Sequence, residues 1–129
     1  MQQISQDMEA GATLPLTLAS ARRARRLVRH AVAARVPDDA LFTLELLTSE
    51  VVTNAVVHAE SSPILRVVAR GARVRVSVQD GSPRWPTCEH AADQALSGRG
   101  MALVDTLASE WGIERLPDEG KRVWFEVHP

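Results

Sequence analysis

The stretch LLTSEVVTNAVVHA, Leu46–Ala59, is mostly apolar, and its pattern predicts a helix in the protein core. Three polar residues interrupt it at intervals of four: Glu50, Asn54 and His58. Four residues turn an α-helix by about 40°, so these side chains form one inclined row about 12 Å long. Removing a carboxylate from water is costly unless the carboxylate is paired or binds a cation. The row therefore marks this helix as a candidate site as well as a core element.

Three interpretations of the row follow from the chemistry of its side chains. It can be a polar seam that faces a water-filled groove or is satisfied by neighbouring backbone. A zinc site is disfavoured, because one His, one carboxylate and one amide are not the ligand set that zinc prefers. The row can also be one wall of a Mg²⁺–nucleotide site, with Asn54 as a metal ligand and Glu50 next to a nucleophile. The row alone does not decide between the seam and the nucleotide site.

The composition is that of a globular protein with one domain. The chain has 129 residues, of which 45% are hydrophobic, and a net charge of -1, which provides no electrostatic case for binding nucleic acid or a membrane surface. Cys88 is the only cysteine, so an intrachain disulfide is excluded. The polar N-terminus does not resemble a signal peptide, and no apolar run approaches the ~20 residues of a membrane span. We expect a cytoplasmic protein.

The order of predicted elements indicates an α+β fold. Two runs of alternating residues flank Gly71 and predict a β-hairpin. We expect a two-layer sandwich, a mixed and mostly antiparallel sheet with helices on one face, in a single domain over residues 12–129. The predicted elements are a flexible tail (1–11), a strand (13–19), a helix capped by Ser20 (20–36), a helix from Asp38 to residue 59, hairpin strands (64–70 and 73–80), a lid (about 81–97), a helix from residue 98, and two strands (110–116 and 121–127).

Two further motifs have the chemistry of a nucleotide site. Asp80 ends the second hairpin strand and precedes Gly81, and its carboxylate could accept a hydrogen bond from an exocyclic amine such as that of adenine; an ordinary turn Asp is the alternative. In SGRGM, Gly98 and Gly100 open a helix whose N–H groups could approach an anion, with Arg99 adding charge. A hinge and helix cap is the alternative here. No GxxxxGK[ST] loop is present.

Taken together and in this order, the motifs resemble the Bergerat (GHKL) ATP-binding superfamily, which includes gyrase B, MutL and histidine kinases. Within it the chain is most similar to the SpoIIAB/RsbW-type anti-sigma factor serine/threonine kinases, in their single-domain actinomycete version. The blocks that carry the resemblance are SEVVTNAVVHA, VRVSVQDGSPRWP, SGRGMALVDTLASEWGI and GKRVWFEV. The similarity extends from about Leu14 to Val127.

The resemblance implies a role for each motif residue. Asn54 would bind Mg²⁺, and Glu50 would be the general base that activates the hydroxyl of a protein substrate. His58 would lie near the phosphates or the lid, and Asp80 would accept a hydrogen bond from the adenine amino group. Lys121, in the block that closes the pocket, is assigned no contact. The remaining cofactor-binding positions are Gly81, Gly98, Arg99, Gly100 and Met101.

The implied function is that of an ATP-binding regulatory protein with ATP and Mg²⁺ as cofactors. It would be a serine/threonine kinase that phosphorylates an anti-anti-sigma (STAS) partner and acts as an anti-sigma factor, with a homodimer possible and no nucleic acid or membrane as partner. One departure keeps an alternative open: Ser82 and Arg84 replace the glycines of the family's D-x-G-x-G motif. The alternative is a non-catalytic Bergerat module that sequesters a sigma factor or antagonist with weak or no ATP binding.

Overall fold

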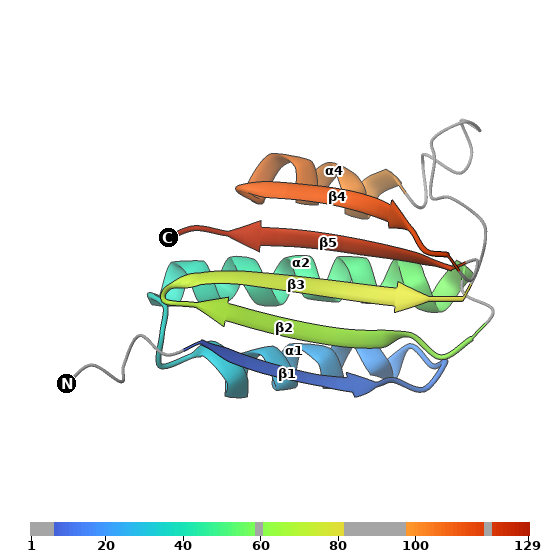
Figure 1. The fold of residues 1–129 in the computed structure, drawn as a ribbon, viewed down its shortest axis with the longest axis horizontal. Helices are drawn as coiled ribbons and strands as arrows, with labels where there is room; N and C mark the ends of the chain where they lie inside the picture. The colour runs from blue at the N-terminus through green and yellow to red at the C-terminus, as the bar shows by residue number, and fades with distance from the viewer. Residues whose placement is uncertain (1–6, 59–60, 82–97, 118–119) are drawn as a thin grey trace.

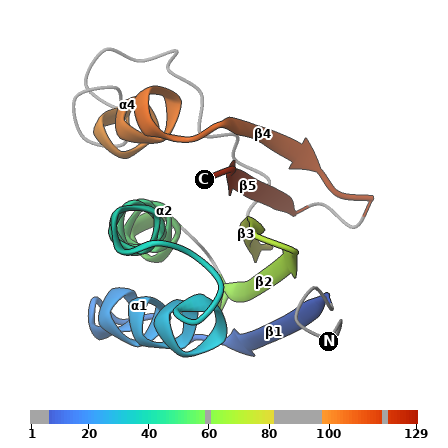
Figure 2. The same cartoon turned by 90° about the vertical axis from the view of Figure 1, so that its left-hand side faces the viewer.

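The chain folds into two layers, in which helices cover one face of a five-stranded sheet (Figures 1 and 2). The computed structural model describes residues 7–58, 61–81, 98–117 and 120–129. Its elements are β1 (Met8–Thr13), α1 (Ala19–Val32), α2 (Asp38–His58), β2 (Ile64–Arg70), β3 (Arg73–Asp80), α4 (Gly98–Leu107), β4 (Glu110–Arg115) and β5 (Lys121–Val127). The strand order is β1-β2-β3-β5-β4. The predicted α+β fold is confirmed, and each neighbouring pair in this sheet is antiparallel rather than mixed.

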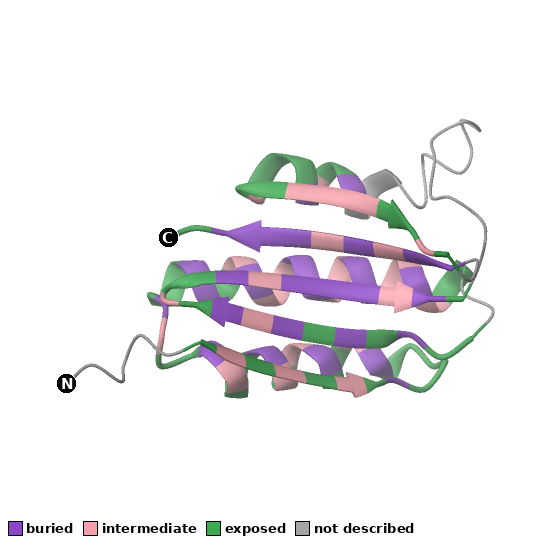
Figure 3. Ribbon diagram, viewed as in Figure 1, coloured by how far each residue is buried: buried purple, intermediate pink, exposed green. Residues whose placement is uncertain are grey.

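The hairpin of β2 and β3 forms the middle of the sheet. Gly71 turns the chain with φ 63°, a conformation that favours glycine. Alternation along β3 then places Val74, Val76 and Val78 under the helices, where all three are buried. Figure 3 shows this central strand as mostly buried. The predicted hairpin is therefore confirmed.

Helix α2 is the central helix of the second layer, and it contacts both α1 and α4 as well as the sheet (Figure 2). Its core face is apolar apart from Thr48 and consists of Ala40, Leu41, Leu44, Leu47, Thr48, Val51, Val52 and Ala55. The outer surface of the helix is exposed, since Phe42 and Val57 are 69% and 61% accessible to solvent. Its two neighbours flank it and leave this outer strip uncovered.

Helix α2 is the one helix in the described residues that is long and apolar enough to be compared with a membrane span. It has 21 residues and contains an 18-residue stretch with a mean hydropathy of 1.4, which by length and composition is enough to cross a membrane. This is weak support for a membrane role, because a helix that packs its core face on a sheet passes the same test. Glu45 and Glu50 lie within it, and for that reason the sequence shows no uninterrupted apolar run.

The start of the chain differs from the prediction. The edge strand lies at Met8–Thr13 rather than at 13–19, so residues 8–11, predicted to belong to the tail, pair with β2. The strand ends before Pro15, which has no N–H to donate to a neighbour. Ser20 does not cap α1: it is buried inside the first turn, and its hydroxyl donates to the carbonyl of Pro15.

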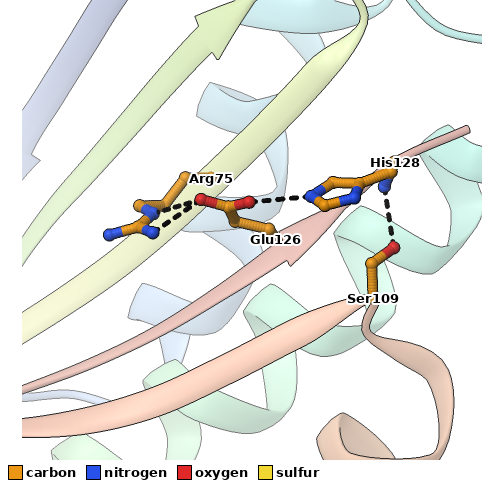
Figure 4. Close-up of polar contacts among 4 residues, drawn as sticks. All are labelled: Arg75, Ser109, Glu126 and His128. Atoms are coloured by element: carbon orange, nitrogen blue, oxygen red, sulfur yellow. Dashed lines mark hydrogen bonds and ion pairs between the residues drawn. The ribbon is translucent and has the colours of Figure 1, made fainter.

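A chain of polar contacts crosses the other face of the sheet, opposite the helices (Figure 4). Arg75 on β3 donates to Oε2 of Glu126 on β5, at 2.6 Å, while Oε1 of Glu126 lies 2.8 Å from Nε2 of His128. The backbone N–H of His128 donates to Ser109 Oγ, just before β4. The contacts therefore connect β3, the end of β5 and the start of β4.

This setting changes the pKa of Glu126. Burial by itself would raise the pKa, but hydrogen bonds from His128 and Arg75, together with their positive charge, outweigh burial and hold the pKa below the usual 4.5. A carboxyl whose pKa is lower in the folded chain stabilises the fold above its unfolded pKa. That stabilisation is lost as the pH falls through the folded pKa.

We predict that Glu126→Gln lowers the melting temperature at pH 7 and that the difference from the wild type shrinks as the pH falls below about 4.5. Thermal melts followed by circular dichroism between pH 7 and pH 3 measure this. Glu114→Gln is the matched control, because the ion pair of Glu114 with Arg122 is more exposed to solvent. A pH-independent difference for Glu126→Gln would contradict the prediction.

Candidate functional site

Three elements that carry the predicted motifs meet at one end of the sheet. The carboxyl ends of α2 and β3 and the amino end of α4 lie together at the right in Figure 1. Helix α2 contacts both α4 and β3. The polar row, the strand-end Asp80 and the glycine-rich helix start, which are far apart in the sequence, are therefore brought to the same region.

The polar row lies at the border of the core. Glu50 and Asn54 are half-buried and His58 is exposed, whereas the residues that point into the core are almost all apolar. The helix is a core element as predicted, and the polar row lies at the edge of its apolar face. The border position reduces the cost of an ionised Glu50, because the carboxylate keeps part of its contact with water. It also leaves the side chains accessible to a ligand.

Asp80 is held in a buried ion pair that sequence analysis missed. Its Oδ1 lies 3.1 Å from Nζ of Lys121, and the two side chains are only 2% and 6% exposed. The residues are direct partners in the antiparallel register of β3 and β5. Lys121 is the only lysine in the chain.

The sequence contained a signal for this pair. Along β3, Asp80 has the same parity as Val74, Val76 and Val78, which face the core, and along β5 Lys121 has the same parity as Val123, Phe125 and Val127. Alternation thus predicts that both charges point inward. An inward lysine needs an acidic partner, because an unpaired buried charge is costly.

Close backbone packing surrounds this pair. A Cβ atom on Gly120 would lie 2.3 Å from the carbonyl oxygen of Asp80, so only glycine fits there. The N–H of Gly81 donates to Ser61 Oγ at 2.9 Å. A hollow of about 380 Å³ adjoins these residues, with Asp80, Gly81, Gly120 and Arg122 among its lining. The backbone at the end of β3 is therefore closely packed and borders the hollow.

The amino end of α4 is formed by the glycine-rich motif. The helix begins at Gly98, and Arg99 and Gly100 lie in its first turn. Free N–H groups at such an end favour an anion. Met101, predicted to bind cofactor, is 8% exposed and belongs to the hydrophobic core, so packing accounts for its presence. Of the predicted lid (about 81–97), residues 82–97, including Ser82 and Arg84, lie outside the described residues.

The side chains of this region that could bind a ligand fit ATP and Mg²⁺. Within the described residues, no group of three or more His, Cys, Asp or Glu side chains could hold a metal ion. Mg²⁺ commonly takes few protein ligands and completes its shell with phosphate oxygens and water. Asn54 can supply one such ligand, while the amino end of α4 suits the phosphates.

Comparison with known proteins agrees with the fold and the motifs. Residues 14–127 match the histidine kinase-like ATPase domain, and the chain belongs to this family. The predicted Bergerat resemblance is confirmed. Family membership implies ATP as the cofactor, typically with Mg²⁺. No curated protein matches the chain.

Several solved structures are similar to this chain, and two of them represent different kinds of protein. The RsbU and RsbW domains of Rv1364c from Mycobacterium tuberculosis have 23% identity and a TM-score of 0.72, covering 94% of this chain and 32% of that one, a likeness that shows the fold. The histidine kinase domain of the blue-light activated histidine kinase from Erythrobacter litoralis EL346 has 25% identity and a TM-score of 0.54. That match covers 98% of this chain and 71% of that one. The chain thus spans about a third of the first structure.

We predict that Lys121→Met lowers the free energy of unfolding by about 3–5 kcal/mol, because it leaves the Asp80 carboxylate buried without its cation. Urea denaturation followed by fluorescence measures the loss. The double variant Asp80→Asn, Lys121→Met should recover much of it, since no full charge then remains in the site. A loss below about 1 kcal/mol for the single variant would contradict the importance of the pair.

Proposed function

We propose that this protein is an ATP-dependent serine/threonine kinase whose substrate is an anti-anti-sigma (STAS) protein and which also acts as an anti-sigma factor. The observation that carries the proposal is the position of Glu50. This carboxylate is half-buried and lies one helical turn before Asn54 on α2, the helix that packs against α4. Nucleotide binding alone does not need a base there, whereas transfer to a hydroxyl does.

Different residues would bind the metal ion, the phosphates and the adenine of ATP–Mg²⁺. Asn54 would hold Mg²⁺, and Gly98, Arg99 and Gly100 would hold the phosphates through the helix end and the guanidinium charge. Asp80 would recognise the adenine amino group, with Lys121 fixing its carboxylate. When bound, ATP supplies the phosphoryl group, and Mg²⁺ neutralises its developing charge.

Glu50 would act on the protein substrate. Its carboxylate would accept the proton of a serine or threonine hydroxyl as that oxygen attacks, which makes the oxygen a stronger nucleophile. Its border position suits this role, because a partner's side chain must reach it from outside. His58, exposed at the end of the same row, lies close to the lid or the phosphates in this proposal.

The regulatory part of the proposal is exchange between partners. The protein would hold a sigma factor in the cytoplasm and release it when it binds the unphosphorylated STAS protein, whose phosphorylation reverses the exchange. The sigma factor would be controlled by protein contact, with no direct contact to nucleic acid or a membrane. A homodimer is compatible with this scheme.

One observation favours a second candidate, a binding module with weak or no ATP binding. The carboxylate of Asp80 is 2% exposed and already has a cation as a partner. If this pair persists unchanged, the side chain contributes to the fold rather than to base recognition. The module would then sequester a sigma factor or antagonist without transferring phosphate.

We predict that Glu50→Gln retains ATP affinity but lowers phosphate transfer to a cognate STAS protein by about 10²–10⁴-fold, because the general base is lost.

Asn54→Ala should abolish Mg²⁺-dependent nucleotide binding, because the protein ligand of the ion is lost. Calorimetry with ATP and Mg²⁺ measures the binding, and transfer of labelled phosphate measures the reaction.

Glu45→Gln is the matched control for both readouts. Glu45 lies on α2 too, but on the side where it pairs with Arg29 of α1, at 2.8 Å. Its loss should leave transfer unchanged. Undiminished transfer by Glu50→Gln would eliminate Glu50 as the base, and absence of ATP binding by the wild type would favour the binding module.

A further inference from the structure

A second hollow, of about 360 Å³, lies on the open face of the sheet beside the turn of the β2–β3 hairpin. This turn is at the opposite end of the sheet from the candidate nucleotide site (Figure 1). Its lining, here called the arginine hollow, consists of Val68, Arg70, Arg73, Arg75 and Glu126. Three cations and one acid thus surround one small space.

The register of the hairpin concentrates positive charge here. Arg70 and Arg73 are direct partners across the antiparallel pair, and Arg75 lies two residues further along the same face of β3. Directly opposed side chains have Cβ atoms about 4.5–5.5 Å apart, and like charges in this arrangement are destabilising. An anion bound between these side chains would remove that repulsion.

The acidic side chains nearby do not neutralise the arginines. Glu126 is shared, with Oε2 on Arg75 and Oε1 on His128. Asp7 reaches Arg70 at 3.4 Å, but both side chains are exposed, and such ion pairs contribute little. Arg73 has no hydrogen-bond or ion-pair partner in the part of the chain that the structure describes. The hollow therefore keeps an excess of positive charge.

Arg75 is held in place before any ligand arrives. Glu126 accepts from the Nε and Nη2 atoms of Arg75, each at 2.6 Å (Figure 4). The guanidinium carbon of Arg75 also lies 4.0 Å from the ring centroid of Trp124. A guanidinium fixed by stacking and by a carboxylate loses less entropy when it binds. The guanidinium of Arg75 is thus already in position, while the side chains of Arg70 and Arg73 can approach a ligand from the hairpin turn.

We propose that the arginine hollow binds a phosphoryl group. A phosphate monoester has three acceptor oxygens and a charge of about -2, which matches three guanidinium groups better than the two oxygens and single charge of a carboxylate. The same chemistry could come from free inorganic phosphate or from a phosphorylated serine or threonine of a protein. This site uses none of the residues of the proposed kinase reaction, so either proposal can fail without the other.

The test is a titration of the ¹⁵N-labelled protein with inorganic phosphate, against sodium chloride at equal ionic strength, followed by NMR. The amide of Gly71 and the Nε–H signals of the arginines should shift and saturate with phosphate only. Arg70→Gln and Arg73→Gln should each weaken the binding by at least about tenfold. Arg66→Gln is the matched control, because Arg66 lies on the same face, pairs with Glu9 and does not line the hollow.

A second readout separates binding from folding. Without phosphate and at low salt, Arg73→Gln should raise the melting temperature, because it removes one of two opposed cations. The proposal is overturned if phosphate gives no saturable shift, if Arg66→Gln weakens binding as much as Arg73→Gln, or if Arg73→Gln lowers the melting temperature.

Peptides distinguish the two sources of the phosphoryl group. A phosphoserine peptide that binds at least tenfold more tightly than inorganic phosphate would identify a phosphoprotein as the ligand, while equal affinities would identify the free anion. Both outcomes support the phosphoryl site. Equal binding of the same peptide with glutamate in place of phosphoserine would overturn it, because the hollow would then recognise any acid.

Discussion

The packing of α2 across the sheet is the constraint on which the rest of the structure depends. Leu44, Leu47 and Val52 of this helix are fully buried, as are Val76 and Phe125 of the sheet. Burial of such side chains contributes the largest favourable term to folding. It also determines the rotation of α2 about its axis, and this rotation places Glu50, Asn54 and His58 at the border rather than in the core.

The ion pair of Asp80 and Lys121 places two charged groups beside a core that is mostly apolar. A buried ion pair is seldom more stable than apolar side chains of similar volume. The free energy needed to remove two charges from water offsets much of the attraction between them. Its position at the meeting point of β3 and β5, beside Gly120 and Gly81, links it to the candidate site. We interpret the pair as holding the Asp80 carboxylate in position, at some cost in the stability of the fold.

The two faces of the sheet have separate chemistry. The helix-covered face ends in the motifs of a nucleotide site, where helix ends, glycines and half-buried polar groups meet. The open face carries arginines that are ordered by Glu126 and Trp124. Because β3 alternates between the faces, a single strand contributes Asp80 to one region and Arg75 to the other.

Periodicity and turn residues were sufficient to predict most elements, since these signals are local. Apolar residues that recur every three or four positions indicated helices, and apolar residues at alternate positions indicated strands. Gly71 located the turn of the hairpin. The same signals failed at β1, a short edge strand whose position depends on its pairing with β2: the N–H of Leu14, just after the strand, donates to Pro63. Local preference cannot show which of several short extended segments finds a partner.

The sequence by itself determined the α+β class, the hairpin and the residue types of the candidate site, with Glu50, Asn54, Asp80 and the glycine-rich helix start in their order. Only the tertiary structure decided which of these residues meet and what else joins them. Strands β3 and β5 are separated in the chain by the residues of a helix and another strand, yet their register pairs Asp80 with Lys121 and Arg75 with Glu126. The physical reason is that register between distant strands depends on packing of the whole sheet, which no local pattern contains.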